Sequence, residues 1–341
     1  MAQRFVVIGA GAIGCRVGGA LATAGADVIF VARAGRAADL AAHGLAIAGL
    51  DGATVPVPPD RFRIAPTASH AARDAAGPIL LLCTKGGATA AAAAEAGAAF
   101  PPGTPILSLQ NGVDNIGRIR EAAPHLLPLA AMVPFNVTLD HEASGRIVAR
   151  QTTSGALHAE DHAVTRALAP LFGRAGLPLT LVADMAPVQW GKLLLNLNNP
   201  VNALSGLPLR DELMDRDCRR ALAALQDEAL AVMKAAGIRP ARIGAAPPRL
   251  IPTILRLPTF AFSRIAASML TIAPTARSSM ADDRSAGRPT EIDDLCGAVV
   301  RLAEAHGLAA PRNAAMIRLV SRHGPGTAMS GRDILAAVTA A

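Results

Sequence analysis

The sequence predicts an α/β protein with an N-terminal Rossmann-type dinucleotide-binding domain and an all-α C-terminal domain. Three observations predict this fold class. A glycine-rich turn follows a short apolar run near the start of the chain. Further apolar runs, each ending in polar residues, continue to about residue 183. Strand patterns then fade and helical patterns replace them. A chain of 341 residues is also long enough for two cores, so we expect domains at residues 1–183 and 184–341.

The glycine-rich turn reads Gly9-Ala-Gly11-Ala12-Ile13-Gly14 and lies between a strand and a helix expected to reach about Gly25. Gly9 allows the tight turn, Gly11 lets the backbone approach a pyrophosphate, and Gly14 lets the helix and strand pack closely. The N–H groups at the helix start, at Ala12 and Ile13, suit the phosphates. The alternative is a glycine-rich turn of another α/β protein, but this strand–turn–helix–strand context favours a dinucleotide site.

The second expected strand, residues 27–32, is followed by Arg33, and no carboxylate lies within residues 31–36. NAD-specific sites usually place an acidic residue at this point. An arginine instead pairs bidentately with a 2′-phosphate. We therefore expect NADPH as the cofactor, with Arg33 as the main phosphate contact. The alternative for Arg33 is a solvated loop charge.

Two later apolar runs also end in polar residues. Residues 78–83 lead into Lys85, and residues 105–109 lead into Asn111. Ligands of open parallel sheets bind beyond the carboxyl ends of the strands, so both residues are candidate site residues. Asn111-Gly112 is also a common hairpin signal, and this alternative stays open.

Several further elements follow from hydrophobic periodicity and turn residues. We expect an alanine-rich helix at residues 88–99, a strand within residues 129–137, a β-hairpin over residues 146–158, a strand at residues 177–182, one long helix over residues 209–236, a helix from near Thr290 to His306, and another after Pro311.

The stretch from Trp190 to Leu204 is an apolar helix with an unusual polar face. Lys192, Asn196 and Asn199 stand at i, i+4 and i+7, which places them on one stripe of the helix. The flanks of this stripe carry Asn198 and Asn202. Asparagine is a poor helix former, so several on one face indicate that the face binds something. Pro200 cannot donate to the carbonyl of Asn196, so a kink is expected there.

The lysine on this stripe is informative because the chain uses arginine almost everywhere else. Only three of its 33 basic residues are lysine, and one of them is Lys192. A buried lysine lowers its pKa readily and can give up a proton, whereas arginine cannot. A solvated helical lysine is the alternative.

A second polar cluster runs from Ser278 to Asp293. Its simplest interpretation is a loop followed by a helix that starts at Thr290, with Thr290 as the N-cap and Asp293 at N3. Glu291 then lies in the first turn, where its negative charge suits the helix dipole. Spacing alone therefore favours a helix-capping role for this cluster over a catalytic one.

The composition indicates a globular protein and argues against several classes of partner. No apolar run reaches the roughly 18 residues that cross a membrane, and the N-terminus lacks the regions of a signal peptide. Four distant cysteines without a C-x-x-C pair favour reduced thiols in the cytoplasm and no metal site. The net charge of +7 suits a small anionic ligand. Scattered arginines and 3% aromatic residues argue against nucleic acid.

Four blocks of residues, taken together, resemble the ketopantoate reductase family (2-dehydropantoate 2-reductases) over nearly the whole chain. The blocks are the glycine turn, Gln110-Asn111-Gly112, Trp190-Gly191-Lys192 with Asn196, and Ser278-Ser279-Met280 through Glu291. The resemblance implies an all-helical second domain and a site between the domains. It also implies NADPH-dependent reduction of a 2-oxo acid, most directly 2-dehydropantoate to pantoate.

The resemblance further implies a role for each site residue. Lys192 is the general acid that protonates the ketone oxygen, and Asn196 and Asn111 orient substrate and cofactor. Lys85 lies by the nicotinamide ribose. The substrate's carboxylate and hydroxyl are contacted by Ser279 and Glu291, and Glu291 is grouped with Lys192 and Asn196 as catalytic. We add Asn199 and Asn202 to the expected substrate contacts.

Two departures from the family pattern lie at the substrate end. Pro200 stands where the family has an asparagine eight residues after the lysine, and Arg210 stands where it has another. Two alternatives therefore remain: an NADP-dependent 2-hydroxy acid dehydrogenase for a different substrate, and a non-catalytic NADP-binding sensor. The sequence leaves a homodimer open.

Overall fold

The chain forms two compact units, residues 1–185 and 186–341. The computed structural model describes residues 2–74, 77–244, 246–267 and 275–340. The first unit is a mixed α/β domain and the second is helical, which confirms the predicted fold class. The break between the units lies two residues from the expected one.

The first unit is organised around an eight-stranded sheet with the order β12-β11-β8-β7-β6-β1-β2-β5. Neighbouring strands run parallel except β8 and β11, which pair antiparallel. A parallel order that starts in the centre and proceeds outward on both sides is the doubly wound arrangement. The strands are β1 Arg4–Ile8, β2 Asp27–Val31, β5 Arg63–Ala65, β6 Ile79–Leu82, β7 Pro105–Ser108, β8 Leu127–Met132, β11 Leu157–Glu160 and β12 Leu179–Val182.

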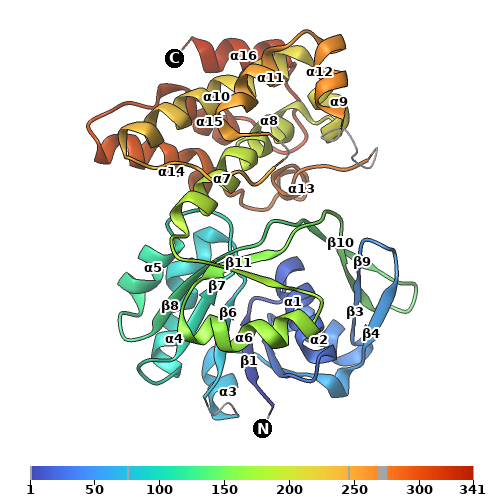
Figure 1. Cartoon of the computed structure of the whole chain (residues 1–341). Helices are drawn as coiled ribbons and strands as arrows, with labels where there is room; N and C mark the ends of the chain where they lie inside the picture. The colour runs from blue at the N-terminus through green and yellow to red at the C-terminus, as the bar shows by residue number, and fades with distance from the viewer. Residues whose placement is uncertain (1, 75–76, 245, 268–274, 341) are drawn as a thin grey trace. The chain divides into compact units, whose positions relative to one another are not determined.

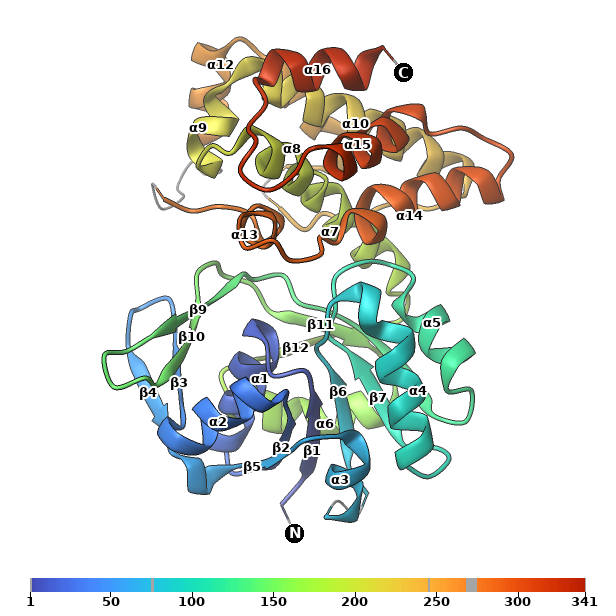
Figure 2. The same cartoon turned by 180° about the vertical axis from the view of Figure 1, so that it is seen from behind.

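Helices cover both faces of this sheet (Figures 1 and 2). Phe5 and Val7 of β1 point into a core shared with helices α1 and α6, where the rings of Phe5 and Phe172 meet edge to face. The alternate residues, Val6 and Ile8, point into a core shared with α3, α4 and α5. This alternation is why β1 is apolar throughout. The helices are α1 Ala12–Thr23, α2 Ala34–His43, α3 Ala68–Arg73, α4 Thr89–Ala99, α5 Asn115–Ala122 and α6 Ala163–Arg174.

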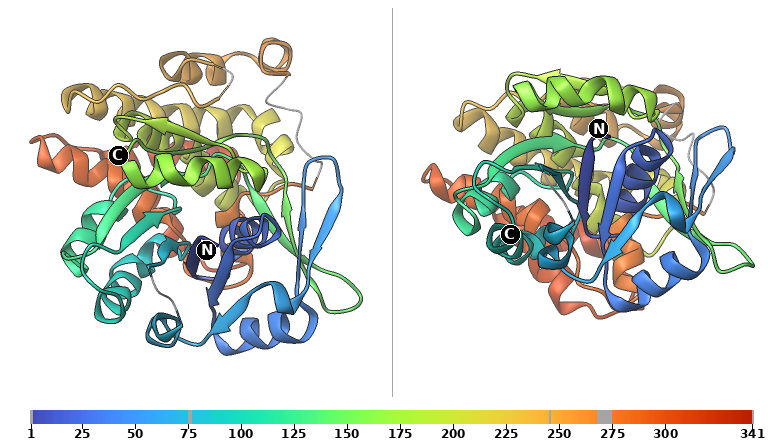
Figure 3. Two further views of the ribbon diagram at one scale, coloured as in Figure 1. Left: turned by 60° about the horizontal axis from the view of Figure 1, so that its bottom comes forward. Right: turned by 90° about the horizontal axis from the view of Figure 1, so that it is seen from below.

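A second sheet of four strands, with the order β4-β3-β10-β9, lies to one side of the first unit (Figure 3). Its strands are β3 Leu45–Ala48, β4 Thr54–Val57, β9 Val137–His141 and β10 Ile147–Gln151. The hairpin expected over residues 146–158 is wrong, because β10 pairs with β9 and β3 while β11 joins the large sheet beside β8. Sequence alternation identifies a strand but does not identify its partner.

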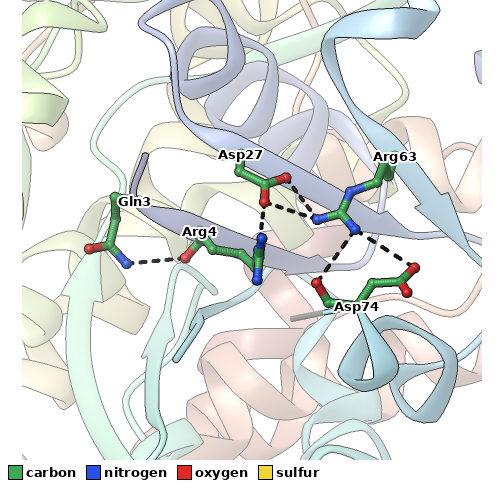
Figure 4. A network of polar contacts seen from close by, with 5 residues as sticks. All are labelled: Gln3, Arg4, Asp27, Arg63 and Asp74. Carbon is green, nitrogen blue, oxygen red and sulfur yellow. Dashed lines mark hydrogen bonds and ion pairs between the residues drawn. The ribbon is translucent and has the colours of Figure 1, made fainter. Parts of the chain in front are cut away.

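An ion-pair network ties together the N-terminal ends of three strands (Figure 4). Asp27 at the start of β2 accepts hydrogen bonds from Arg4 of β1 at 2.5 Å and from Arg63 of β5 at 2.8 Å. Burial would raise the pKa of Asp27, but the bonds from the two arginines outweigh it and hold this pKa below its usual value. The network therefore stabilises the sheet edge opposite the glycine turn.

The second unit is built around α10, which packs against α8, α9, α11, α14, α15 and α16 (Figures 1 and 2). Its helices are α7 Ala186–Asn196, α8 Asn198–Ser205, α9 Leu209–Met214, α10 Arg216–Ala235, α11 Ile251–Arg256, α12 Thr259–Ile265, α13 Ser279–Ser285, α14 Ile292–Ala305, α15 Pro311–Arg322 and α16 Gly331–Thr339. Short 3₁₀ turns lie at Pro59–Arg61, Gly86–Ala88 and Pro248–Leu250. Across the described ranges, no helix has the length and apolarity that a membrane span needs.

Two breaks shape the helical unit. The helix containing Lys192 stops at Asn196 and resumes at Asn198, as the missing N–H of Pro200 predicts. The single helix expected over residues 209–236 is wrong, because Asp215 separates α9 from α10. Its side chain accepts from the backbone N–H groups of Asp217 and Cys218 and so starts a new helix.

Candidate functional site

The glycine turn has the geometry that its three glycines predict. Gly9 has φ of 105° and its N–H donates to the carbonyl of Val31 at 3.3 Å. A Cβ on Gly14 would lie 2.0 Å from the Gly9 carbonyl oxygen, so no other residue fits there without a shift. A Cβ on Gly11 would meet nothing within 4 Å. The turn is therefore tightly packed at Gly9 and Gly14 and open at Gly11.

The open side of this turn fits a dinucleotide. Gly11 is the N-cap of α1, so Ala12 and Ile13 are its first helical residues and their N–H groups have no carbonyl partner within the helix. The first turn contains no acidic residue that would repel a phosphate. These features match a pyrophosphate at a helix N-terminus.

Arg33 lies at the carboxyl end of β2, as the N-cap of α2. Arg33 is exposed, and its side chain makes no capping hydrogen bond to α2. Arg36, one turn further along α2, was not singled out from the sequence, although one of its guanidinium nitrogens is buried without a partner among the described residues. Both arginines extend from the segment that in Rossmann folds meets the adenosine ribose.

Lys85 and Asn111 lie at neighbouring strand ends, where β6 and β7 run parallel. A buried network around Gln110 fixes the two loops to each other. The Gln110 amide donates to the carbonyl of Thr84 at 2.9 Å and to the hydroxyl of Thr89 at 2.8 Å. The carbonyl of Asn111 accepts from the Asn115 side chain at 2.7 Å. Asn111 therefore lies in a strand-to-helix loop, and the hairpin alternative is wrong.

The same loops adjoin the glycine turn. A Cβ on Gly9 would lie 3.0 Å from the backbone of Cys83 and Thr84, just before Lys85. The structure thus brings Gly9, Gly11, Gly14, Lys85 and Asn111 to one edge of the sheet. The sequence pointed to Gln110 only as part of the Gln110-Asn111-Gly112 block, and its positioning role was missed because its partners Thr84 and Thr89 are distant in sequence.

Lys192 lies in the middle of α7 and is partly buried. Burial lowers the pKa of its ammonium to about 8. The preceding residue, Gly191, allows a close approach, because a Cβ there would lie 2.3 Å from the carbonyl oxygen of Ala241. The helix is fixed to the same segment by the N–H of Ala241, which donates to Pro187 at 2.7 Å. Asn196, one turn after Lys192, is partly buried and ends the helix.

The asparagines of α8 face two different environments. Asn199 is partly buried on the surface of the unit. Asn202 is fully buried, and its amide donates to the carbonyl of Leu207 at 2.9 Å and to Glu212 at 3.4 Å. Its oxygen accepts from the N–H of Ser278 at 2.9 Å. These bonds use the whole carboxamide, so the expected substrate contact by Asn202 is replaced by a packing role.

The second polar cluster divides between α13 and α14. Ser278 is the buried N-cap of α13 and Ser279 is its exposed first residue. The guanidinium of Arg284 holds α13 in place by donating to the carbonyl of Ala203 at 2.7 Å. Glu291, not Thr290, is the N-cap residue of α14, which begins one residue later than expected.

Each unit therefore contributes a distinct chemical capability. The first has an open glycine turn at a helix N-terminus, a cationic side chain at the end of β2, and a lysine and an asparagine beyond neighbouring strands. The second has a lysine whose pKa is lowered to about 8 by burial, with Asn196 one turn away and Ser279 next to an anchored N-cap. An amine with a lowered pKa is one of the side-chain groups that can act in general acid–base catalysis.

Two family models match the chain. The model described as ketopantoate reductase PanE/ApbA matches residues 5–163, and its C-terminal counterpart matches residues 184–323. The 2-dehydropantoate 2-reductase of Mycobacterium tuberculosis is 29% identical over 331 residues, covering 96% of this chain and 100% of that protein. The enzyme of the same name from Caulobacter vibrioides is 29% identical over 224 residues, covering 64% of this chain and 68% of that protein.

Solved structures agree with these matches. The PanE/ApbA family ketopantoate reductase of Ralstonia eutropha has a TM-score of 0.76 and 29% identity, covering 93% of this chain and 97% of that one. A D-mandelate dehydrogenase bound to NADH and anilino(oxo)acetate shares the fold, with a TM-score of 0.73, 19% identity and coverage of 97% and 99%. Members of the matched family are NADP-dependent oxidoreductases, and this chain belongs to the ketopantoate reductase family.

Proposed function

We propose that this protein reduces 2-dehydropantoate to pantoate with NADPH, and that Lys192 is the general acid. The observation that carries the proposal is the lowered pKa of Lys192, about 8, in a chain whose sequence matches the family along both units. At neutral pH the Lys192 side chain is mainly protonated, yet it gives up its proton more easily than a solvated lysine does.

The proposed reaction divides its work between cofactor and protein. NADPH, when bound, supplies the hydride that adds to the carbonyl carbon. The Lys192 ammonium donates its proton to the ketone oxygen, and its charge stabilises the developing alkoxide before the transfer is complete. Lys192 then regains a proton from solvent. Asn196 offers an amide that orients an oxygen without competing for the proton.

The remaining roles are also proposals. Gly11, Ala12 and Ile13 supply the backbone surface for the pyrophosphate, and Arg33 binds the 2′-phosphate. Lys85 and Asn111 contact the nicotinamide half of the cofactor from the strand ends. The substrate's polar groups are assigned to Asn199, Ser279 and Glu291. We leave Asn202 out of this set because its carboxamide is used within the helical unit.

A second candidate is reduction of a different 2-oxo acid by the same chemistry. Pro200 and the exposed Arg210 mark the departures from the family pattern at the substrate end. The D-mandelate dehydrogenase fold neighbour indicates that one fold accommodates other 2-oxo acids. NADPH consumption measured with 2-dehydropantoate and a panel of aliphatic and aromatic 2-oxo acids separates the candidates. A kcat/KM highest for 2-dehydropantoate supports the first, a higher value for another acid supports the second, and no turnover with any acid overturns both.

Two assignments complete the proposal. A ketopantoate reductase of Staphylococcus aureus is described as dimeric, and we propose a homodimer for this chain as well. We also keep the cytoplasm as the proposed location, consistent with four free cysteines. Size-exclusion chromatography with light scattering tests the dimer.

A further inference from the structure

Glu212 of α9 is an ionisable residue that the proposed chemistry does not use. Its side chain is fully buried, with 0% exposure. One carboxyl oxygen, Oε2, accepts from the amide of Asn198 at 2.9 Å and from the amide of Asn202 at 3.4 Å. Within the described part of the chain, no arginine or lysine forms an ion pair with Glu212. A buried carboxylate without a cation is costly, so the site calls for an explanation.

Two unsatisfied atoms supply that explanation. The other carboxyl oxygen, Oε1 of Glu212, is buried without a partner among the described residues, and so is the carbonyl oxygen Oδ1 of Asn198. Both atoms are acceptors while Glu212 is ionised, so neither can satisfy the other. A proton on Oε1 changes this, because an acid and a primary amide can form a reciprocal pair. Asn198 Nδ2 then donates to Oε2, and Oε1 donates back to Asn198 Oδ1.

The surroundings favour the neutral acid. Burial raises the pKa of Glu212 to about 8, more than its two amide donors lower it, and the negative charge of Asp215 raises it further. The helices that pack most closely against α9 are α8 and α10, and the N–H of Leu209 in α9 also donates to the carbonyl of Ala276. Helix α8 contributes no titratable side chain. The start of α10 contributes the Asp215 carboxylate, the Cys218 thiol and the Arg219 guanidinium. That guanidinium donates to backbone carbonyls, including Leu213 at 2.8 Å.

The acid also lies at the start of a chain of contacts that leads to the substrate face. Glu212 holds Asn202, and Asn202 accepts from the N–H of Ser278, the N-cap of α13. The Ser278 hydroxyl in turn donates to the carbonyl of Asn199 at 3.3 Å. Asn199 and the adjacent Ser279 are both proposed substrate contacts.

We propose that Glu212 is a protonated carboxylic acid, paired reciprocally with Asn198, that positions Asn202 and the α13 N-terminus for substrate binding. The pairing is independent of what the enzyme reduces, whereas the positioning role rests on the proposed function. Glu212→Gln is the matched variant, because its amide can keep both hydrogen bonds without a titratable proton. Glu212→Ala removes both. Glu304→Gln, on exposed α14 surface, makes the same chemical change elsewhere in the helical unit.

Infrared difference spectroscopy of the full-length protein at neutral pH tests the pairing without substrate. We expect wild type minus E212Q to contain the carbonyl stretch of a protonated carboxyl group, and wild type minus E304Q to lack it. A carboxylate band in its place, as expected for an ionised Glu212 hydrated by buried water, would overturn the pairing.

Steady-state kinetics test the positioning role. We expect E212A to raise the KM for the 2-oxo acid by about tenfold, the scale of one lost buried hydrogen bond, with a much smaller change in kcat. E212Q should restore the wild-type KM. A KM that E212Q leaves raised, or a KM that E212A leaves unchanged, would overturn this role. Neither readout depends on Lys192→Ala, whose failure would instead count against the proposed function.

Discussion

The glycine turn of the first unit and the α7–α8 segment of the second use different parts of the chain for function. In the proposed function the turn acts through its backbone N–H groups, and Gly11 leaves open space beside them because it has no side chain. The proposed role of the α7–α8 segment depends on side chains whose environments differ within about three helical turns. Burial lowers the pKa of Lys192 to about 8, whereas the carboxamide of Asn202 is used in hydrogen bonds within the helical unit. A site formed by backbone groups can therefore be predicted from the sequence. The role of a side chain can be assigned only when its packing in the folded protein is known.

The largest expected effect is a loss of turnover on substitution of Lys192 in the α7–α8 segment. Lys192→Ala should lower kcat by ~10²–10⁴, the scale of general acid–base catalysis, because no other group is assigned to protonate the alkoxide. NADPH binding, measured by fluorescence titration, should remain. Lys234→Ala, at an exposed position near the end of α10, is the control and should keep full turnover. Equal turnover in both variants would remove Lys192 from the mechanism.

The backbone half of the comparison is tested by two alanines. Gly14→Ala places a Cβ 2.0 Å from the Gly9 carbonyl and should cost at least ~3 kcal/mol of unfolding free energy. Gly11→Ala meets nothing within 4 Å, so we expect unchanged stability and at least tenfold weaker NADPH binding, because the methyl occupies the ligand's side. Thermal unfolding and NADPH titration of both variants distinguish the roles. Full affinity in Gly11→Ala would contradict the pyrophosphate site.

Arg33 should decide which dinucleotide binds. Arg33→Ala is expected to weaken NADPH binding roughly ten- to a hundredfold, the scale of a charge-assisted pair with phosphate, and to leave NADH binding unchanged. Arg174→Ala, an exposed arginine at the end of α6, should alter neither affinity. Equal losses for both cofactors would indicate that Arg33 contacts something other than the 2′-phosphate.

The smallest expected effect belongs to the network of Figure 4, on the opposite edge of the sheet. Asp27→Asn should cost about 1 kcal/mol, since its partners are partly exposed and screened by solvent. The folded-state pKa of Asp27 is lowered, so this contribution exists above the unfolded pKa and disappears as pH falls through the folded pKa. Urea unfolding followed by circular dichroism should therefore separate wild type from D27N at pH 7 and not at strongly acidic pH. A difference that persists in acid would point to packing instead.

Sequence analysis went furthest where local rules decide the structure. The glycine turn, the alanine-rich α4 and the break caused by Pro200 follow from steric rules that act within a few residues. The expected hairpin over residues 146–158 is wrong because β10 pairs with the preceding strand β9 and the distant β3, while β11 pairs with β8 of the other sheet. Asp215 was missed as a cap because a polar residue inside an amphipathic pattern also suits a helix surface.

The candidate site shows the same limit. Spacing placed Lys192, Asn196 and Asn199 on one stripe, but it could not tell that Asn202 is buried against Glu212 and Ser278. The positioning role of Gln110 was missed for a similar reason, since it depends on two loops that only the folded sheet brings together. Tertiary contacts of this kind leave no periodic signal in one sequence.

The ionisation of Lys192 is the most direct test of the central claim. The chain contains three lysines, so ¹³C labelling of lysine gives a spectrum simple enough to follow by NMR, and K192A identifies the resonance. We predict that this resonance titrates near pH 8 and that kcat for reduction falls about tenfold per pH unit above that point, because the deprotonated amine has no proton to give. A Lys192 resonance that titrates near the ordinary lysine value of about 10.4 would contradict the account.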